Sequence, residues 1–250
     1  MELSNYGLKE LGRTEKVCDK HGPYTEIAYN KFTQSCRGCY EEKLKEEDRL
    51  KQERDAQEII ERRIYRAGIP LRFSDRRLDT FIATEAGQQR ALATSRAFVD
   101  GYKRQSGQSL IFCGGVGAGK THLSVGIAHD LILKGVECRF LSVIGAIRSV
   151  KETYSRGSEI TERQALDNLI NPDLLILDEV GVQFGSEAEK MILFEIINGR
   201  YENMKSTIVI SNLALEPLKE YLGDRVVDRL REGGGKMVVF DWDSYRRQAA

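Results

Sequence analysis

A run of eight residues, Gly-Gly-Val-Gly-Ala-Gly-Lys-Thr, occupies positions 114–121. Its glycines allow several backbone N–H groups to converge on phosphate oxygens, and a helix N-terminus supplies partial positive charge at the same place. We expect Lys120 to reach the β and γ phosphates of a nucleoside triphosphate, and the Thr121 hydroxyl to hold Mg²⁺. The residues expected to bind the nucleotide are Gly114, Gly115, Val116, Gly117, Ala118, Gly119, Lys120, Thr121 and His122.

The flanking sequence has to position this loop. The apolar run Leu110–Cys113 before it predicts a buried strand, and the run His122–Leu133 after it predicts a helix. A strand, a glycine-rich loop and a helix in this order form the arrangement that a phosphate-binding loop requires. A glycine-rich turn without a ligand is the alternative, and the flanking elements argue against it.

A second apolar run, Leu174–Leu177, ends in two carboxylates. Such a short run is typical of a buried parallel strand, whose functional residues stand at its carboxyl end. We expect Asp178 to orient the ligands of Mg²⁺ and Glu179 to polarise the water that attacks the γ phosphorus. An acidic strand end that only caps the next turn is the alternative. Together with the loop upstream, the pair predicts hydrolysis of the nucleotide.

A third strand is predicted over residues 206–212, where a β-branched run ends in Asn212. This amide could lie beside the γ phosphate and the attacking water. An asparagine at a strand end more often makes a turn, so the order of the three motifs along the chain carries the prediction.

Two short pairs of metal-ligand type stand near the N-terminus. Cys18 and His21 form the first pair and Cys36 and Cys39 the second, each with two residues between its members. Fourteen residues separate the two pairs. Soft thiolates with one imidazole favour tetrahedral Zn²⁺ in a closed, structural site. Gly22 and Gly38 stand where turns in such knuckles need a permissive backbone. The four expected zinc ligands are Cys18, His21, Cys36 and Cys39.

The cysteines also allow other interpretations. A redox pair of Cys36 and Cys39 is one alternative, but the surrounding sequence lacks the β-α-β pattern of such proteins. A disulfide framework does not suit a cytosolic ATPase. Cys113 and Cys138 lie in apolar strand segments, where we expect them to be small core residues.

The segment Tyr40–Arg66 is dominated by Glu, Lys and Arg and predicts a long, solvated helix. Its few apolar positions do not hold a heptad, so a coiled coil is not favoured. A spacer is the simpler interpretation, and a helix that binds a partner is its rival. Gly68 and Pro70 end the helix. The predicted ranges are 1–40 for a zinc-binding module, 41–68 for a charged helical linker and 69–250 for the ATPase domain.

Composition narrows the function classes. The chain has 250 residues, 41% of them hydrophobic, and equal numbers of basic and acidic residues, 38 of each. Fourteen of each kind lie in residues 1–68, which leaves 24 of each for the remainder. Contact with nucleic acid must therefore be local rather than spread over a broad basic face. No apolar stretch approaches the length of a membrane span and no signal peptide opens the chain, so we expect a cytoplasmic protein without a membrane partner.

These motifs resemble the DnaC/DnaI-type helicase loaders, in the branch of AAA+ ATPases that also includes the IstB-like transposition proteins. The resemblance covers about residues 68–248. It rests on the phosphate loop, residues 174–183, the strand end at Asn212, and the blocks Leu222–Arg231 and Val239–Arg246. The zinc segment looks like that of prophage-encoded members and is similar in kind to the zinc-bearing N-domain of DnaI.

The resemblance implies an α/β fold with the three-layer AAA+ core and a parallel sheet. It also implies an ATPase that assembles into an open ring or spiral, in which Arg229 looks like the arginine finger that reaches a neighbour's γ phosphate. Arg246 looks like the second sensor arginine. Residue chemistry alone does not choose which arginine is the arginine finger, since Arg225, Arg229 and Arg231 are all possible. The alternative for Arg246 is a solvated arginine without a role in the site. Because the chain ends soon after Arg246, we expect the helical lid to be reduced or absent.

The resemblance also implies that a helical insertion at about residues 142–160 contacts single-stranded DNA. This stretch contains Arg148, Lys151, Tyr154 and Arg156. Cations that neutralise phosphates, beside an aromatic ring that can stack on a base, give a physical reason for that role, and we expect Arg148, Lys151 and Tyr154 to make the contact. Such residues are also common on an ordinary helix face.

The function implied is an ATP-dependent loader that delivers a replicative DNA helicase hexamer to single-stranded DNA in the primosome, with ATP, Mg²⁺ and Zn²⁺ as cofactors. Its hydrolysis is expected to be slow without DNA or the partner. Two alternatives stay open. One is an IstB-like ATPase that assembles on duplex DNA and recruits a transposase. The other is a non-enzymatic adaptor that nucleotide only stabilises.

Overall fold

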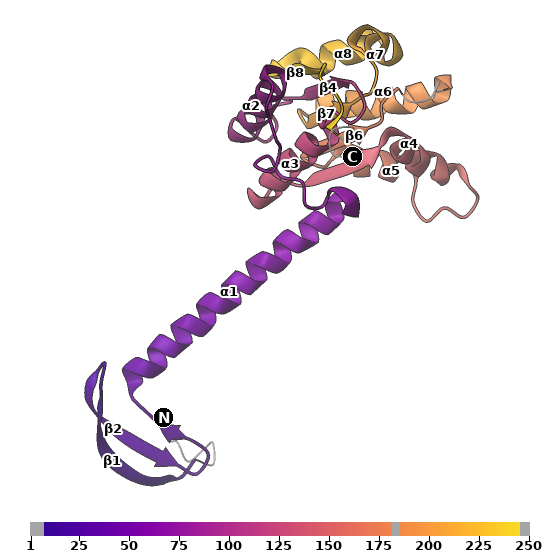
Figure 1. Ribbon diagram of the computed structural model, residues 1–250. Helices are drawn as coiled ribbons and strands as arrows, with labels where there is room; N and C mark the ends of the chain where they lie inside the picture. The colour runs from indigo at the N-terminus through magenta and orange to yellow at the C-terminus, as the bar shows by residue number, and fades with distance from the viewer. Residues whose placement is uncertain (1–7, 182–185, 246–250) are drawn as a thin grey trace. The chain divides into compact units, whose positions relative to one another are not determined.

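A computed structural model describes residues 8–181 and 186–245 (Figure 1). These residues belong to two units, residues 1–59 and 60–250, and each unit is described by itself. The boundary between the units falls inside the charged segment for which a linker is predicted. The three functional ranges given above remain a prediction.

The first unit contains a small antiparallel sheet in the order β1-β2-β3. Its strands are β1 (Glu10–Cys18), β2 (Gly22–Tyr29) and β3 (Thr33–Gln34). The turn between β1 and β2 closes with Cys18 opposite Gly22, whose φ is 79°. Cys36 is the one buried residue among the described residues 8–59. A unit with so little buried apolar surface needs another source of stability, such as a bound metal ion.

Helix α1 (Arg37–Ala67) carries the charged segment and begins three residues before the predicted start at Tyr40. Ion pairs one turn apart support its exposed faces: Arg37 with Glu41, and Arg49 with Glu46 and Glu53. In the second unit, Ala67 is fully buried and Ile60 packs against the core. Gly68, with a φ of 70°, ends the helix.

The second unit is built on a five-stranded parallel sheet in the order β5-β6-β7-β4-β8 (Figure 1). Its strands are β4 (Leu110–Gly114), β5 (Cys138–Ser142), β6 (Leu174–Asp178), β7 (Ser206–Ile210) and β8 (Lys236–Phe240). Alternate residues of β4 enter two separate cores, with Leu110 and Phe112 on one side and Ile111 and Cys113 on the other. Burial on both faces explains why these strands are almost continuously apolar.

Helices cover both faces of this sheet. On one face lie α2 (Ala86–Asp100) and α3 (Lys120–Leu133), together with the short helix η2 (Leu71–Phe73). The other face packs against α4 (Val143–Lys151), α5 (Glu162–Ile170), α6 (Glu187–Glu202), α7 (Leu215–Leu222) and α8 (Asp224–Arg231). The predicted three-layer α/β fold is confirmed. Short helices η3 (Glu152–Tyr154) and η4 (Glu232–Gly234) complete it.

The predicted strands and helix of the nucleotide motifs are present. The strand before the loop is β4, the helix after it is α3, and the acidic run is β6. β7 ends at Ile210, two residues before Asn212. Because these strands are parallel, the loop, Asp178 and Asn212 follow the carboxyl ends of neighbouring strands at one edge of the sheet. Among the described residues, no helix has the length and apolar character needed to cross a membrane.

At the other end of the strands, the fully buried guanidinium of Arg200 ties α6 to the sheet. Its Nε donates to Thr207 Oγ1 at 3.0 Å and its Nη2 donates to the Ser206 carbonyl. Its Nη1 donates, at 2.9 Å each, to the carbonyl oxygens of Leu169, Ile170 and Pro172. A buried charge is tolerated when every donor has such a partner.

Replacing Arg200 by Met should therefore lower the free energy of unfolding by about 3 to 5 kcal/mol, because four carbonyls and one hydroxyl lose their donor inside the protein. Urea denaturation of the full chain measures the change. Arg90→Met on the exposed face of α2 is the matched control and should change stability by less than about 0.5 kcal/mol. Equal, small effects of both substitutions would contradict a structural role for Arg200.

Candidate nucleotide and zinc sites

The phosphate loop is confined by two parts of the chain that are distant from it in sequence, residues 240–244 and Phe81. Three of its glycines have positive φ: Gly114 at 124°, Gly117 at 78° and Gly119 at 96°. A Cβ atom at these positions would collide with the Phe240 carbonyl, the Ser244 side chain and the Phe81 ring, respectively. Only glycine therefore fits the loop, both in conformation and in space.

Lys120 begins α3 and is 4% exposed. Its Nζ donates to the carbonyl oxygens of Gly114 at 2.8 Å and Gly115 at 2.6 Å, which hold the ammonium within the loop. Burial lowers the pKa of Lys120 to about 8, and the neighbouring Asp178 carboxylate opposes this change. The negative charge of a triphosphate would favour the charged ammonium further.

The two predicted magnesium ligands lie together. Thr121 Oγ1 donates to Asp178 Oδ2 at 3.0 Å, and Asp178 Oδ1 accepts the backbone N–H of Glu179 at 2.7 Å. Burial raises the pKa of Asp178 above its ordinary value. One hydroxyl and one carboxylate beside a phosphate loop are the hard oxygen ligands that suit Mg²⁺, so the residues fit this ion.

Glu179 has a φ of 63°, in the left-handed region that residues other than glycine rarely adopt. The strain, of order 1 kcal/mol or more, persists because the next residue is anchored: Val180 donates its N–H to the Ile210 carbonyl at 2.9 Å. Among the described residues no group hydrogen-bonds the Glu179 carboxylate. It is exposed at the strand edge, where a water molecule could reach it.

Ser211 is a positioning residue that the sequence motifs do not reveal. It is fully buried; its Oγ donates to the Val180 carbonyl at 2.6 Å, and its N–H donates to the Phe112 carbonyl at 2.8 Å. It therefore joins the ends of β4, β6 and β7. The next residue, Asn212, is exposed at the same edge of the sheet, and its side chain makes no hydrogen bond within the described part of the chain.

The segment after β8 packs against the phosphate loop. Trp242 Nε1 donates to the Ala118 carbonyl at 3.0 Å, and the Tyr245 N–H donates to the Gly117 carbonyl at 3.2 Å. This packing gives a physical reason why the block Val239–Arg246 accompanies the loop. Arg246, the predicted sensor, lies outside the described residues.

The side chain of His122 contacts the segment 77–81. Its Nε2 lies 2.9 Å from the Arg77 carbonyl and 3.1 Å from Thr80 Oγ1, and its ring meets Phe81 edge-on at 5.3 Å. The imidazole thus fixes the segment before α2. A contact from this residue to a phosphate would come from its backbone N–H.

Three arginines of α8 are candidates for the arginine finger, which would reach the γ phosphate bound by a neighbouring copy. Arg225 and Arg231 are exposed, whereas Arg229 is partly buried. Its guanidinium lies over the rings of Phe194 at 5.0 Å and Tyr201 at 5.5 Å, and its buried Nη1 has no hydrogen-bond partner in the described residues. Stacking on two rings holds Arg229 in one orientation.

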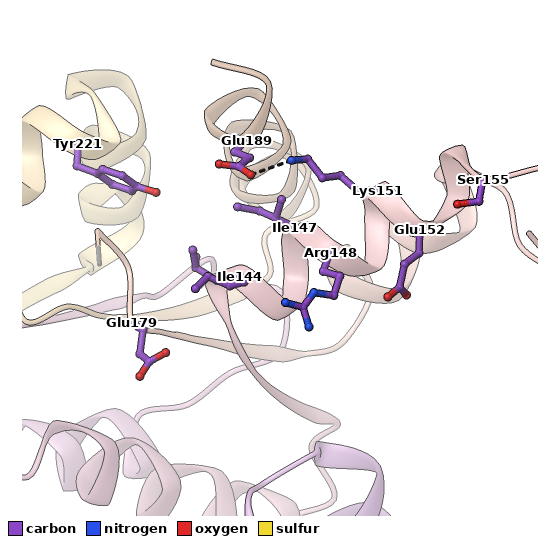
Figure 2. A pocket seen from close by; sticks show the side chains of 10 residues that line it. Ile144, Ile147, Arg148, Lys151, Glu152, Ser155, Glu179, Glu189 and Tyr221 are labelled. Atoms are coloured by element: carbon purple, nitrogen blue, oxygen red, sulfur yellow. Dashed lines mark hydrogen bonds and ion pairs between the residues drawn. The ribbon is translucent and has the colours of Figure 1, made fainter. Parts of the chain in front are cut away.

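A pocket of about 360 Å³ lies between α4 and the start of α6, and Figure 2 shows the side chains around it. It brings two of the predicted DNA-binding residues, Arg148 and Lys151, together with Glu179. Lys151 Nζ pairs with Glu189 Oε1 at 2.8 Å. Tyr154 does not line this pocket, and its hydroxyl donates to Glu162 Oε1 at 2.7 Å.

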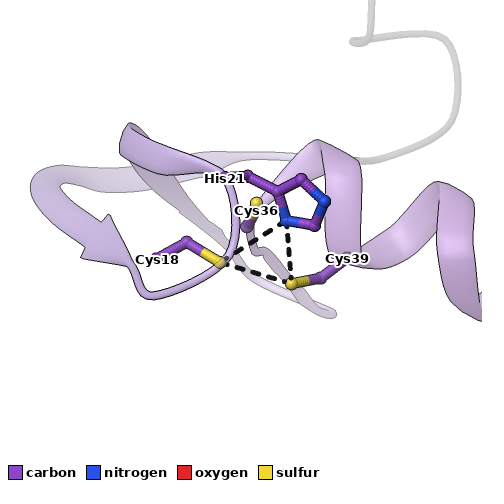
Figure 3. A group of neighbouring side chains, drawn as sticks. All are labelled: Cys18, His21, Cys36 and Cys39. Atoms are coloured by element: carbon purple, nitrogen blue, oxygen red, sulfur yellow. Dashed lines mark hydrogen bonds between the residues drawn. The ribbon is translucent and has the colours of Figure 1, made fainter.

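The four predicted zinc ligands converge at the start of α1, as Figure 3 shows. Their ligand atoms all lie within 4.8 Å of one another. Cys18 Sγ is 3.4 Å from Cys39 Sγ, and His21 Nδ1 is 3.6 Å from the first sulfur and 3.5 Å from the second. In a tetrahedral site with Zn–S bonds of about 2.3 Å, neighbouring sulfurs are about 3.8 Å apart. The residues therefore fit Zn²⁺ with little movement, whereas a disulfide would need a much shorter separation.

The surroundings of this cluster also suit a metal ion. His21 Nε2 lies 3.3 Å from Glu42 Oε1, the carboxylate contact that commonly orients a zinc-binding histidine. The hydrogen bond with His21 lowers the pKa of Cys18 to about 6, and the hydrogen bond with Cys18 raises the pKa of Cys39 to about 11. One thiolate is thus already favoured near neutral pH, and zinc would displace the other protons.

Gly38 corrects one expectation. It lies in α1 rather than in a turn, and a Cβ there would come within 2.5 Å of the His21 ring. Glycine is needed because the imidazole packs directly on the helix backbone, not because of an unusual backbone angle. Gly22, with its positive φ, does serve the predicted turn.

The purified chain should carry about one Zn²⁺ per molecule, and Cys36→Ser/Cys39→Ser should carry close to none, because two of four ligands are lost. Elemental analysis by mass spectrometry measures the ratio of zinc to protein. Cys138→Ala is the matched control, since this buried thiol lies in β5, outside the cluster. Zinc retained by the double variant would show that the metal is bound elsewhere.

Comparison with known proteins places this geometry in a family. Residues 30–250 match the model of the IstB-like ATP binding protein family. The replicative helicase loader DnaC of Buchnera aphidicola subsp. Baizongia pistaciae is 33% identical over 189 residues, which is 76% of this chain and 76% of that protein. The replicative helicase loader DnaC of Escherichia coli strain K12 is 38% identical over 160 residues, 64% of each protein.

A solved structure agrees with the sequence comparisons. The crystal structure of the DnaC helicase loader superimposes with a TM-score of 0.62 at 30% identity, covering 68% of this chain and 99% of that one. The match with the Escherichia coli relative spans just under two thirds of that protein's length, 64%. The chain therefore belongs to the family of IstB-like ATP binding proteins, and AAA+ proteins of the DnaC type are among its relatives.

Proposed function

We propose that this protein is an ATP-dependent loader that delivers a replicative DNA helicase hexamer to single-stranded DNA. The observation that carries the proposal is the match of this chain to proteins named replicative helicase loader, together with a phosphate loop whose Thr121 lies in contact with Asp178. The first unit, with its cluster of possible zinc ligands, would supply a separate surface for the partner.

The nucleotide site supports hydrolysis by residues in distinct positions. Lys120 and the loop amides bind the phosphates, and Mg²⁺ bound by Thr121 and Asp178 would neutralise charge that develops on them. Glu179, exposed at the end of β6, would orient the attacking water, with Asn212 on the neighbouring strand edge. A general base of this kind contributes about 10² to 10⁴ in rate.

Assembly into an open ring or spiral would complete the site. Arg229 of a neighbouring copy would reach the γ phosphate, and Arg246 would act as the second sensor. Because one copy cannot supply an arginine in trans, we propose that hydrolysis by the isolated chain is slow. The assembly would have two states, one that holds the helicase and one that releases it. Nucleotide would switch between them, since a nucleotide with a γ phosphate would bind the two states with different affinities.

The α4 face would contact single-stranded DNA. Arg148 and Lys151 line a pocket near the nucleotide edge, and Tyr154 is exposed on the following short helix. Cations with an adjacent aromatic ring suit phosphates and a stacked base. These residues give a local basic contact in a chain of balanced charge, as the composition requires.

The family description supports a second candidate function. IstB-like relatives give their name to the family, so an ATPase that assembles on duplex DNA and recruits a transposase is the second candidate. Affinities for single-stranded and duplex oligonucleotides of equal length distinguish the two. A clear preference for the duplex would favour the second.

Glu179→Gln should bind ATP as tightly as the wild type but hydrolyse it at least about 100-fold more slowly, because the amide cannot polarise water. Lys120→Ala should lose binding itself. Fluorescent-nucleotide titration and phosphate release measure the two steps separately. If Glu179→Gln hydrolysed ATP at the wild-type rate, the catalytic assignment would fail. If the wild type bound ATP without any turnover in the presence of DNA and helicase, the adaptor function would be favoured.

The loader should form a stable, stoichiometric complex with the replicative helicase of its host, and native mass spectrometry with ATP or ADP detects it. If the first unit contacts the helicase, Cys36→Ser/Cys39→Ser should lose the complex, while Cys138→Ala should keep it. Absence of a complex with either nucleotide would exclude the proposed loader and favour the transposition function.

A further inference from the structure

The pocket beside α4 contains an ion pair that occupies one of its cations. Lys151 Nζ and Glu189 Oε1 are 2.8 Å apart, and both residues line the pocket; Figure 2 shows their side chains pointing toward each other. Arg148 lines the same pocket but forms no ion pair or side-chain hydrogen bond with any described residue. The two cations proposed to bind DNA are therefore in different states: one is free and the other is already neutralised.

Glu189 is held in place by a second set of contacts. It is the third residue of α6, and its Oε2 accepts the Ser186 N–H at 3.0 Å, while Ser186 Oγ accepts the Glu189 N–H at 3.4 Å. This reciprocal capping box fixes the carboxylate at the helix N-terminus. One oxygen is used for the cap, so the other is free to hold Lys151.

A DNA phosphate would make the same interaction with Lys151 as the Glu189 carboxylate makes. Both are anions that accept hydrogen bonds from an ammonium. The ammonium has three N–H donors and could contact both anions, but two anions that share it would repel each other. DNA phosphate therefore binds Lys151 at full strength when the carboxylate moves away.

We propose that Glu189 is a built-in competitor of DNA phosphate for Lys151, so that the contact of this face with single-stranded DNA is held below its full strength until the ion pair opens. The inference rests on the proposed function, because it concerns the same DNA-binding face. It adds a regulatory residue that acts on α4 from α6, and it places the competition in the pocket that also contains Glu179.

The pair is suited to reversible competition because it is weak. The Lys151 and Glu189 side chains are 42% and 30% exposed, and ion pairs of such exposure contribute little stability. Competition from the carboxylate therefore weakens DNA binding by about 1.4- to 5-fold, which tunes affinity without preventing binding.

Glu189→Gln separates the two contacts of this residue. Glutamine at the third helical position still completes a capping box, but it carries no charge for Lys151. Glu187→Gln is the matched control: it removes the same charge from the same helical turn, where Glu187 pairs with Lys190 instead. Fluorescence anisotropy with a labelled oligothymidylate measures the affinity of the full chain. Glu189→Gln should bind about 1.4- to 5-fold more tightly than the wild type, and more tightly than Glu187→Gln.

A double-mutant cycle tests whether Glu189 acts through Lys151. With Lys151→Ala in the background, the added Glu189→Gln change should leave affinity unchanged. Equal gains from Glu187→Gln and Glu189→Gln, or a gain that persists in the Lys151→Ala background, would overturn the inference, since net charge alone would then explain it. Binding that is unaffected by Lys151→Ala, while oligothymidylate still binds, would refute it as well. No binding by any variant would refute both the inference and the DNA contact of the proposed function.

Discussion

The fit of a glycine backbone into a crowded space is the constraint on which the nucleotide site depends. The end of β8, the segment after it and the Phe81 ring press on the phosphate loop from different sides. Side chains at those glycines would force the loop open, and the amides that face a phosphate would lose their common direction. The same packing buries Lys120 and starts α3 at the loop. Phosphate binding is thus a property of the assembled ATPase unit, not of eight residues alone.

The parallel sheet brings the other groups to this loop. Neighbouring strands end at one edge, which puts Asp178 against Thr121 and places Glu179 in a strained conformation that Val180 and Ser211 secure. In the proposed function, an arginine from a neighbouring copy would complete the site. Nucleotide could then report on the state of a multi-subunit complex.

Sequence patterns predicted the elements whose chemistry is local. Apolar runs that end in a glycine-rich loop or in carboxylates indicated β4 and β6, and cysteine spacing indicated the cluster on which Figure 3 centres. Contacts between distant segments were not predictable. Phe81 and Ser211 contact the loop or its strands from elsewhere in the chain, and no local pattern marks them. Trp242 lies in a block that the family resemblance singled out, but its contact with the loop could not be read from the sequence. Gly38 resembled a turn glycine, although it serves the close approach of an imidazole to a helix.

We propose that a unit suited to bind zinc, a charged helix and an ATPase act together as a helicase loader, and an unwinding assay tests this proposal most directly. The host's replicative helicase is mixed with a circular single strand that carries an annealed, labelled oligonucleotide, and release of the oligonucleotide is followed with ATP present. The account predicts that the wild-type chain accelerates release and that Lys120→Ala does not. Release at the same rate with and without the chain, despite a stable complex with the helicase, would contradict it.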